Sequence, residues 1–423
     1  MQTAVLPGTE RRLLHINIVT GQPQANLIPL LFFKPDRVAL VVTHGMMEQD
    51  KGRSFAQILK KVEVIADGAV EQFEFPDRDY RRMEEEACTI LVDLLDRYPD
   101  HDIVLNATGG TKLISQAWVK AIEMDEQRCS AFYLDTDHNR LEWLQPQQPA
   151  NEIPDVLTVE HAVKAQGFTK RKTDSDNLDW VKKAESRQAL TIWLGQNAVA
   201  LDRLIGEINW GLASFDTKKH PGEAVVLKTC DLRNGPIGDA LKLMGQQGLI
   251  DLAEDAAQAT FYVKDESSLI YLKGGWMEEY VWLRLRGAGV REVCCGMDQT
   301  HDIKRSSDLR NELDAVAVHR NHVLVIECKT ANLTQESEFN RVLQKLDSIG
   351  NNTGGSLGQK WLVLGRIPIS GRDTEEREKS VERMDLRAKS MNIKLIKPSD
   401  LPALKNIITS WMRQEPFHDD AAL

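Results

Sequence analysis

Residues 313–329 read LDAVAVHRNHVLVIECK, and this stretch decides the fold of the C-terminal part of the chain. Two runs rich in β-branched and other apolar residues flank four polar residues, a pattern typical of a β-hairpin. If Val318 faces Val323 across the turn, Asp314 faces Glu327 at the open end of the hairpin. Facing residues have Cβ atoms about 5 Å apart, so we expect the two carboxylates to converge.

Two converging carboxylates repel each other, and a divalent cation between them would remove that cost. Lys329 shares the strand face of Glu327 because side chains alternate along a strand. We therefore expect Mn²⁺ or Mg²⁺ to bind Asp314, Glu327 and the backbone carbonyl of Cys328, with Lys329 beside a metal-bound water. Such a site suits phosphodiester hydrolysis, although a solvated hairpin end with a Glu–Lys pair would carry the same pattern.

Length and composition indicate an ordinary folded protein. The 423 residues suffice for two or three domains, and 42% hydrophobic with 27% charged residues excludes wholesale disorder. The net charge of -10 means that any bound nucleic acid must meet a local basic groove. The six cysteines form no CxxC pair, which argues against a zinc knuckle or a disulfide framework and favours a cytoplasmic location. Because no segment approaches about 20 consecutive apolar residues, we expect no membrane contact.

The N-terminal part of the chain alternates short apolar runs with helical patterns, which is typical of a parallel sheet covered by helices on both faces. We therefore expect a Rossmann-like α/β domain over residues 1–150. The expected strands are 13–19, 37–42, 102–106 and 131–134, and the expected helices are 26–33, 54–60, 80–97 and 112–124.

The remaining chain divides into two further parts. Residues 145–179 are polar and proline-bearing, so we read them as a linker at the start of a central region, 151–273. Within that region, a helix at 239–247 leading into strand 259–263 favours a winged-helix-like module over a plain helical spacer. Residues 274–423 then predict a compact C-terminal α/β domain, with a frayed acidic end.

Residues 106–112 read NATGGTK, between a buried-strand pattern and an apolar helix. Glycine after a strand lets the backbone approach a ligand, and the helix N-terminus offers N–H groups to phosphate or ribose oxygens. The stretch matches neither GxGxxG nor the Walker A motif, which disfavours a dinucleotide dehydrogenase and an NTPase. A tight strand-to-helix turn without a ligand would have the same sequence.

The NATGGTK stretch resembles the signature loop of CARF domains, the sensors of cyclic oligoadenylates in type III CRISPR immunity. Residues 20–22, TGQ, resemble the first ligand loop of these domains. The resemblance implies ligand contacts at five residues of the NATGGTK stretch, which are Thr108, Gly109, Gly110, Thr111 and Lys112. Four further residues are weaker candidates: Thr20, Gln22, Thr43 and His44.

The hairpin resembles the PD-(D/E)xK nuclease superfamily, with Asp314 as the first acid and Glu327-Cys328-Lys329 as the ExK element. Residues 274–281, GGWMEEYV, resemble the opening helix of such nucleases and favour Glu278 over Glu279 as an acid that points into the site. The helix after the ExK strand carries LQKLD at 343–347, where the resemblance implies a further polar site residue. We take Lys345 ahead of Gln344 for this role.

Taken in order, these features resemble the CRISPR ancillary nucleases that join one CARF domain to one restriction-endonuclease-like domain. The resemblance implies a homodimer that holds one cyclic oligoadenylate, most often cyclic tetra-adenylate, and then cuts DNA, RNA or both. Two alternatives remain open at this point. One is a CARF and winged-helix transcriptional regulator with an inactive nuclease-like domain, and the other is a ring nuclease that degrades the messenger itself.

Overall fold

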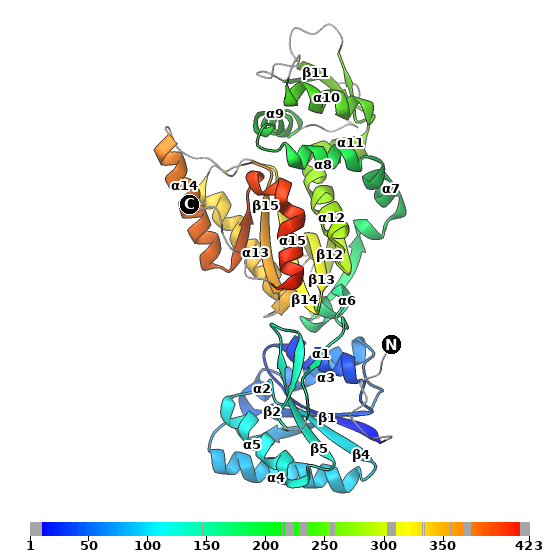
Figure 1. Cartoon of the computed structure of the whole chain (residues 1–423), viewed down its shortest axis with the longest axis vertical. Coiled ribbons are helices and arrows are strands. Elements are labelled where there is room, and N and C mark those ends of the chain that lie inside the picture. The colour runs from blue at the N-terminus through cyan, green and yellow to red at the C-terminus, as the bar shows by residue number, and fades with distance from the viewer. Residues whose placement is uncertain are drawn as a thin grey trace.

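The computed structural model describes residues 11–145, 148–213, 215, 224–227, 235–253, 259–302, 310–331, 333, 335–355, 358–366 and 374–414. Three parts are stacked along the long axis of the molecule (Figure 1). The N-terminal domain lies at one end, the C-terminal domain lies in the middle, and a small central module lies at the other end. The chain therefore runs past the C-terminal domain to the central module and then returns to complete the C-terminal domain. The acidic end expected to fray lies outside the described residues.

The N-terminal domain is built on a seven-stranded sheet of order β3-β2-β1-β4-β5-β6-β7. Strands β1 to β5 pair in parallel, and β6 and β7 are antiparallel additions. The strands are β1 (Arg12–Ile18), β2 (Arg37–Thr43), β3 (Val70–Phe75), β4 (His101–Asn106), β5 (Cys129–Asp135), β6 (Arg140–Trp143) and β7 (Asn151–Glu152). The helices are α1 (Pro23–Phe33), α2 (His44–Glu48), α3 (Lys51–Lys61), α4 (Tyr80–Arg97) and α5 (Lys112–Ile122).

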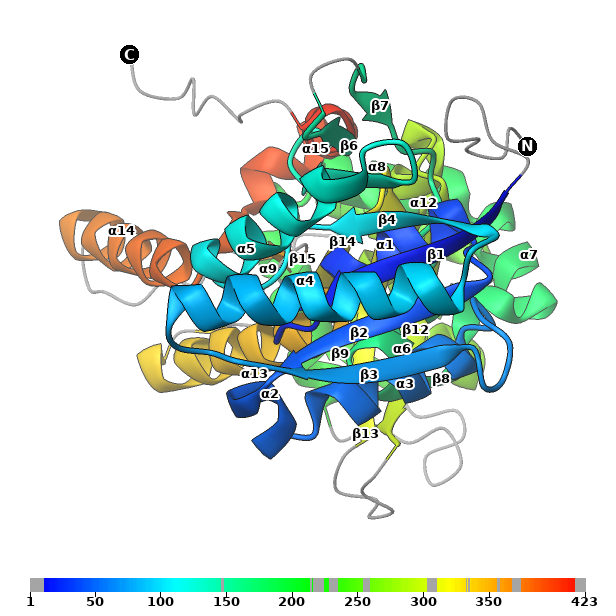
Figure 2. The same ribbon diagram turned by 90° about the horizontal axis from the view of Figure 1, so that it is seen from below.

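This architecture confirms the expected Rossmann-like domain. Apolar residues of α1 and α3 pack on one face of the sheet, and those of α4 and α5 pack on the other. Figure 2 shows α4 lying across that second face. The sequence did not predict β3, whose VEQFEF pattern is that of a half-exposed edge strand. Strand order reverses between β1 and β4, and in open α/β sheets ligands bind beyond the carboxyl ends of strands at such a point.

The C-terminal domain contains a six-stranded sheet of order β16-β15-β14-β13-β12-β8. Its strands are β8 (Phe168–Thr173), β12 (Glu292–His301), β13 (Arg310–His319), β14 (His322–Lys329), β15 (Gly358–Leu364) and β16 (Ile393–Ile396). Its helices are α12 (Trp276–Ala288), α13 (Glu336–Gly354), α14 (Thr374–Ser390) and α15 (Leu404–Arg413).

The predicted hairpin register is confirmed: Val318 pairs with Val323, and Val316 pairs with Val325. The two faces of the hairpin enter different parts of the core, as alternation along a strand requires. Its valines pack in the cluster that includes apolar residues of α13, whereas Ala315 and Ala317 pack in the cluster that includes α12 and α15.

The interpretation of residues 145–179 as a linker is wrong. This segment contains β7, helix α6 (Val159–Ala165) and β8, and β8 pairs antiparallel with β12 in the C-terminal sheet. The strand reads FTKRKT and buries only Phe168 and Thr173, because it lies at the sheet edge, where Arg171 and Lys172 are exposed. A run of three basic residues thus looked like a linker, although it is an edge strand.

The central module combines helices with a small antiparallel sheet of order β10-β11-β9. It contains the expected helix followed by a β-wing, which here are α10 and β10–β11. The elements are α7 (Leu178–Ser186), α8 (Gln188–Gln196), α9 (Asp202–Leu212), β9 (Ala224–Leu227), α10 (Pro236–Gln246), β10 (Ile250–Leu252), β11 (Ala259–Val263) and α11 (Glu266–Ile270). Within the described ranges, no helix has the length and apolar character needed to cross a membrane.

Candidate active site and ligand loop

The open end of the β13–β14 hairpin brings together the carboxylates of Asp314 and Glu327. The Glu327 side chain is almost completely buried, and Lys329 Nζ lies 2.7 Å from its Oε1 atom. The same ammonium lies 4.0 Å from Asp314 Oδ2. Asp314 Oδ2 also accepts a hydrogen bond from the backbone N–H of Cys328 at 2.6 Å. One lysine and one backbone N–H therefore hold both carboxylates in place.

Helix α13 contributes Lys345 to this site. Its Nζ atom lies 3.1 Å from Glu327 Oε1, the oxygen that Lys329 also contacts. The neighbouring Gln344 is exposed. The geometry therefore supports the preference for Lys345 over Gln344.

Helix α12 places Glu278 and Glu279 on different sides. Glu279 is buried and accepts a hydrogen bond at 2.9 Å from Nε of Arg187, which lies between α7 and α8. Glu278 instead interacts electrostatically with Asp314, Lys329 and Glu312. Glu278 is thus the glutamate that faces the hairpin site.

Gly274, which comes just before α12, allows this helix to approach the end of β14. Gly274 has φ +133°, and a Cβ atom there would lie 2.9 Å from Thr330 Oγ1. Thr330 follows Lys329 directly, so the close approach sets Glu278 beside the hairpin end.

Burial and like charge shift the ionisation of the acids. Burial raises the pKa of Asp314 to about 6, the Glu327 charge adds to this, and Lys329 opposes it. Burial, followed by the charges of Asp314 and Glu312, raises the pKa of Glu278 to about 8. Burial lowers the pKa of Lys329, but the two carboxylates outweigh this and raise it. Burial and like charge together therefore outweigh the charge of the lysine, and added positive charge would stabilise the ionised acids.

The donor set fits a hard divalent cation. Carboxylate and carbonyl oxygens are the ligands that Mg²⁺ and Mn²⁺ prefer, and Asp314 and Glu327 supply two of them side by side. In the described part of the chain, no group of three or more His, Cys, Asp or Glu side chains is arranged to hold a metal ion. The predicted set needs only two carboxylates, completed by the Cys328 carbonyl.

Sequence reasoning missed two acids near the site, Glu312 and Asp174, whose charges both raise the pKa of Glu278. Glu312 lies two residues before Asp314 on β13, so strand alternation could have identified it. Asp174 follows β8, and the interpretation of that segment as a linker concealed it.

In the N-terminal domain, the residues expected to bind a ligand gather at the carboxyl ends of three adjacent strands. Thr20 follows β1, Thr43 ends β2, and residues 106–112, here called the glycine loop, follow β4. A Cβ atom on Gly109 would lie 2.4 Å from the carbonyl oxygen of Ile18, so only glycine lets this loop rest on β1. Gly110 has φ +81°, a conformation that also favours glycine.

Several of these expected ligand residues also hold the loops together. Thr108 Oγ1 accepts a hydrogen bond from the backbone N–H of Leu134 at 2.7 Å, and Thr20 Oγ1 accepts one from Gln22 N–H at 3.1 Å. Thr111 caps α5 by accepting from the N–H of Ile114. Thr43 is largely buried.

Other predicted ligand residues differ in where their side chains lie. Gly110, Thr111 and Lys112 are exposed at the start of α5. The Gln22 side chain lies next to Gly355, at the end of α13 in the other domain. The weaker candidate His44 is exposed, and its Nδ1 atom lies 2.8 Å from Glu74 Oε1. The exposed start of α5 is therefore the best-placed ligand surface.

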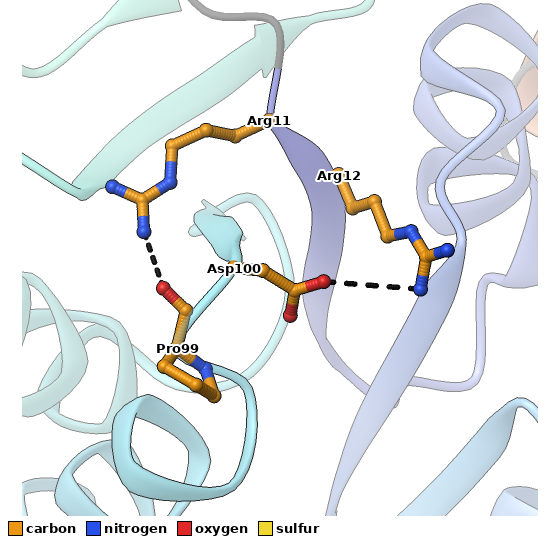
Figure 3. Close-up of a pocket in the computed structure, with 4 residues that line it drawn as sticks. All are labelled: Arg11, Arg12, Pro99 and Asp100. Carbon is orange, nitrogen blue, oxygen red and sulfur yellow. Dashed lines mark hydrogen bonds and ion pairs between the residues drawn. The ribbon is translucent and has the colours of Figure 1, made fainter.

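A cavity of about 590 Å³ lies at the opposite edge of this sheet, lined by Arg11, Arg12, Pro99 and Asp100 (Figure 3). Arg11 donates to the Pro99 carbonyl, and Arg12 lies 3.8 Å from Asp100. These residues stand at the amino ends of β1 and β4, far from the glycine loop. Their pairing ties together two strand starts, and the cavity lies away from the ligand edge of the fold.

Comparison with known proteins gives both domains a family. A family model of the Card1 CARF domain matches residues 14–161, and one of the Card1-like endonuclease domain matches residues 265–415. A search of curated protein sequences found no match.

Two solved structures share the fold over nearly the whole chain. The crystal structure of protein VC1899 from Vibrio cholerae is 17% identical, with a TM-score of 0.75, and the match covers 95% of this chain and 98% of that chain. Can2 from Sulfobacillus thermosulfidooxidans, solved in complex with cyclic tetra-adenylate, is 21% identical, with a TM-score of 0.69 and coverage of 94% and 97%.

The family matches coincide with the two sites described above. The CARF match contains the glycine loop, and the endonuclease match contains Glu278, the hairpin acids and Lys345. Together the two matched segments span most of the chain, which therefore belongs to the CARF–nuclease proteins, with a Card1-type CARF domain and a Card1-like endonuclease domain.

Proposed function

We propose that this protein is a metal-dependent nuclease of type III CRISPR defence that is activated by a cyclic oligoadenylate. The observation that carries the proposal is the convergence of Asp314, Glu327, Lys329 and Lys345 at one hairpin end of the endonuclease domain. A protein that only bound nucleic acid would have no physical reason to bury two adjacent carboxylates there.

Asp314, Glu327 and the Cys328 carbonyl would hold Mn²⁺ or Mg²⁺. When bound, such a cation polarises a phosphoryl oxygen and lowers the pKa of a coordinated water. Lys329, whose ammonium contacts both carboxylates, is placed to stabilise the negative charge that develops on the phosphoryl oxygens. Lys345 supplies a second positive charge from the solvent side, where it can bind the phosphate next to the cleaved bond.

The glycine loop and residues 20–22 form the proposed messenger site. Exposed backbone and side-chain groups at Gly110, Thr111 and Lys112 stand at the start of α5, where N–H groups and the helix dipole favour phosphate. The similar fold of Can2, solved with cyclic tetra-adenylate, supports that messenger as the activator. A ring of repeated units fits a pocket shared by two CARF domains, so we propose that the protein is a homodimer. We also propose that it acts in the cytoplasm.

The deciding experiment is a cleavage assay with Mn²⁺ or Mg²⁺, in which labelled single-stranded DNA, labelled RNA and supercoiled plasmid are incubated with and without cyclic tri-, tetra- or hexa-adenylate. The proposal expects cleavage that needs both metal and one of these rings. Messenger-dependent DNA binding without cleavage would instead establish a regulator with an inactive nuclease-like domain. Loss of the messenger with no cut nucleic acid would establish a ring nuclease.

A further inference from the structure

Helix α13 connects the acidic site to the boundary between the two domains. Lys345 lies at the middle of the helix, and Thr353 lies completely buried in its last turn. Eight residues at 1.5 Å each separate them, so the acidic site stands about 12 Å along one helix from the boundary. Between them, Lys360 Nζ of β15 lies 2.5 Å from Asp347 Oδ1 and fixes the middle of the helix.

At the boundary, the end of α13 meets the segment that follows residues 20–22. Gln24 is buried in the first turn of α1, and its Nε2 atom donates to the backbone carbonyl of Thr353 at 3.4 Å. Three glutamine side chains surround Gly355: a Cβ atom there would lie 2.7 Å from Gln166 Nε2, 2.8 Å from Gln24 Oε1 and 3.3 Å from Gln22 Oε1. Apolar residues of α1, α6 and α13 also share one hydrophobic cluster across the boundary.

The contact around Gly355 has an unusual polar composition. Gln24 Oε1 is a buried acceptor and Gln166 Nε2 is a buried donor, and neither has a hydrogen-bond partner among the described residues. Buried polar groups are normally paired, because an unpaired one costs free energy. Both atoms lie within 2.8 Å of the place that a Cβ atom on Gly355 would take, so they are close enough to pair if the α13 end moves. The contact therefore allows two arrangements, one in which these two atoms are unpaired and one in which they pair with each other.

We propose that Gln24 and Gln166 are positioning residues that couple residues 20–22 of the messenger site to Lys345 through α13. The proposal rests on the activation by cyclic oligoadenylate proposed above. A messenger that binds residues 20–22 differently in two arrangements of this contact shifts the protein toward one of them. Because α13 is continuous from Lys345 to Thr353, displacement of its end is carried along the helix and changes how Lys345 meets Glu327.

The test compares Gln24→Leu with the matched control Gln299→Leu in the full-length protein. Gln299 also contacts the α13 end, where its Nε2 donates to Thr353 Oγ1 at 3.3 Å, but it belongs to the same domain as the helix. Gln166→Leu is the second variant, in case Gln24→Leu does not fold. Hydrogen exchange of each protein is measured with and without cyclic tetra-adenylate, together with messenger affinity and cleavage at saturating messenger.

In the wild type and in Gln299→Leu, we expect messenger to change exchange both at residues 20–22 and along α13. In Gln24→Leu and Gln166→Leu, exchange at residues 20–22 should still change, α13 should not respond, and cleavage should fall about tenfold without weaker messenger binding. An α13 response that is the same in all four proteins, or absent in the wild type while residues 20–22 respond, would overturn the coupling role alone. A wild type in which neither segment responds would overturn the proposed activation as well.

Discussion

Lys345 Nζ lies 3.1 Å from Glu327 Oε1, and the same oxygen lies 2.7 Å from Lys329 Nζ. One buried carboxylate oxygen is thus shared by lysines from two elements, β14 and α13. Glu327 would also bind the proposed cation, so the position of Lys345 affects how this carboxylate is oriented toward the cation.

Lys345→Ala should lower the rate of nucleic acid cleavage. The side chain contributes a positive charge next to the proposed phosphate site, and we expect a loss of about ten- to a hundredfold in kcat. The neighbouring exposed residue offers a matched control, since Gln344→Ala removes a side chain from the same helix turn. Equal activity of the two variants would show that Lys345 has no role in cleavage.

Glu278 and Glu279 should respond to substitution in opposite ways. Glu278→Gln removes a buried carboxyl group near Asp314 whose ionised form is disfavoured, so cleavage should fall while the free energy of unfolding stays the same or rises. Glu279→Leu leaves the buried guanidinium of Arg187 unpaired, which should cost about 3–5 kcal/mol of stability. Denaturant unfolding and cleavage assays on both variants check this, and a stable, inactive Glu279 variant would reverse the assignment.

These acids illustrate what a sequence can and cannot reveal about a site. Strand alternation and hairpin register were sufficient to bring Asp314 and Glu327 together at one end of the hairpin, because both depend on local geometry. The Lys345 contact with Glu327 depends on how α13 packs on the sheet, and only the family resemblance pointed to it. The contribution of Asp174 could not be predicted, because it requires β8 to join a sheet whose next strand begins more than a hundred residues later.

The dependence on local sequence patterns also explains which strands of the fold could be predicted. Buried parallel strands such as β1, β2 and β4 each contain a short apolar run and were predicted. The edge strands β3 and β8 carry several polar residues, and β16 has only four residues, so none of them has a long apolar run. The contact between Gln24 and Thr353 joins residues that are far apart in the chain, so no local pattern indicates it.

Lys112→Ala should weaken messenger binding. The exposed ammonium at the start of α5 can make one charge-assisted hydrogen bond to a phosphate, so affinity should fall about ten- to a hundredfold. Lys120→Ala is the control, since Lys120 lies on the same helix but pairs with Glu84 of α4 at 2.7 Å. Calorimetric titration with cyclic tetra-adenylate measures both, and excess messenger should restore cleavage by the Lys112 variant. Unchanged affinity in that variant would contradict the proposed contact.

The N-terminal domain should lose stability as pH falls from 7 to 5. Burial lowers the pKa of His15 from 6.5 to about 3, so the unfolded chain binds a proton that the folded chain excludes. Stability is therefore present above pH 6.5 and declines below it, by about 2 kcal/mol at pH 5. Denaturant unfolding at several pH values should show a smaller decline in His15→Gln than in the wild type. Parallel pH profiles would show that His15 titrates normally.

The central claim is that metal-dependent cleavage occurs at the hairpin carboxylates under control of the messenger. The most direct measurement compares wild type with Glu327→Gln, which keeps the shape of the side chain but removes a charged ligand. Cleavage with Mn²⁺ and cyclic tetra-adenylate is measured alongside messenger affinity. We predict that cleavage by the variant falls by orders of magnitude, while its messenger affinity stays close to that of the wild type. Undiminished, messenger-dependent cleavage by Glu327→Gln would contradict the account.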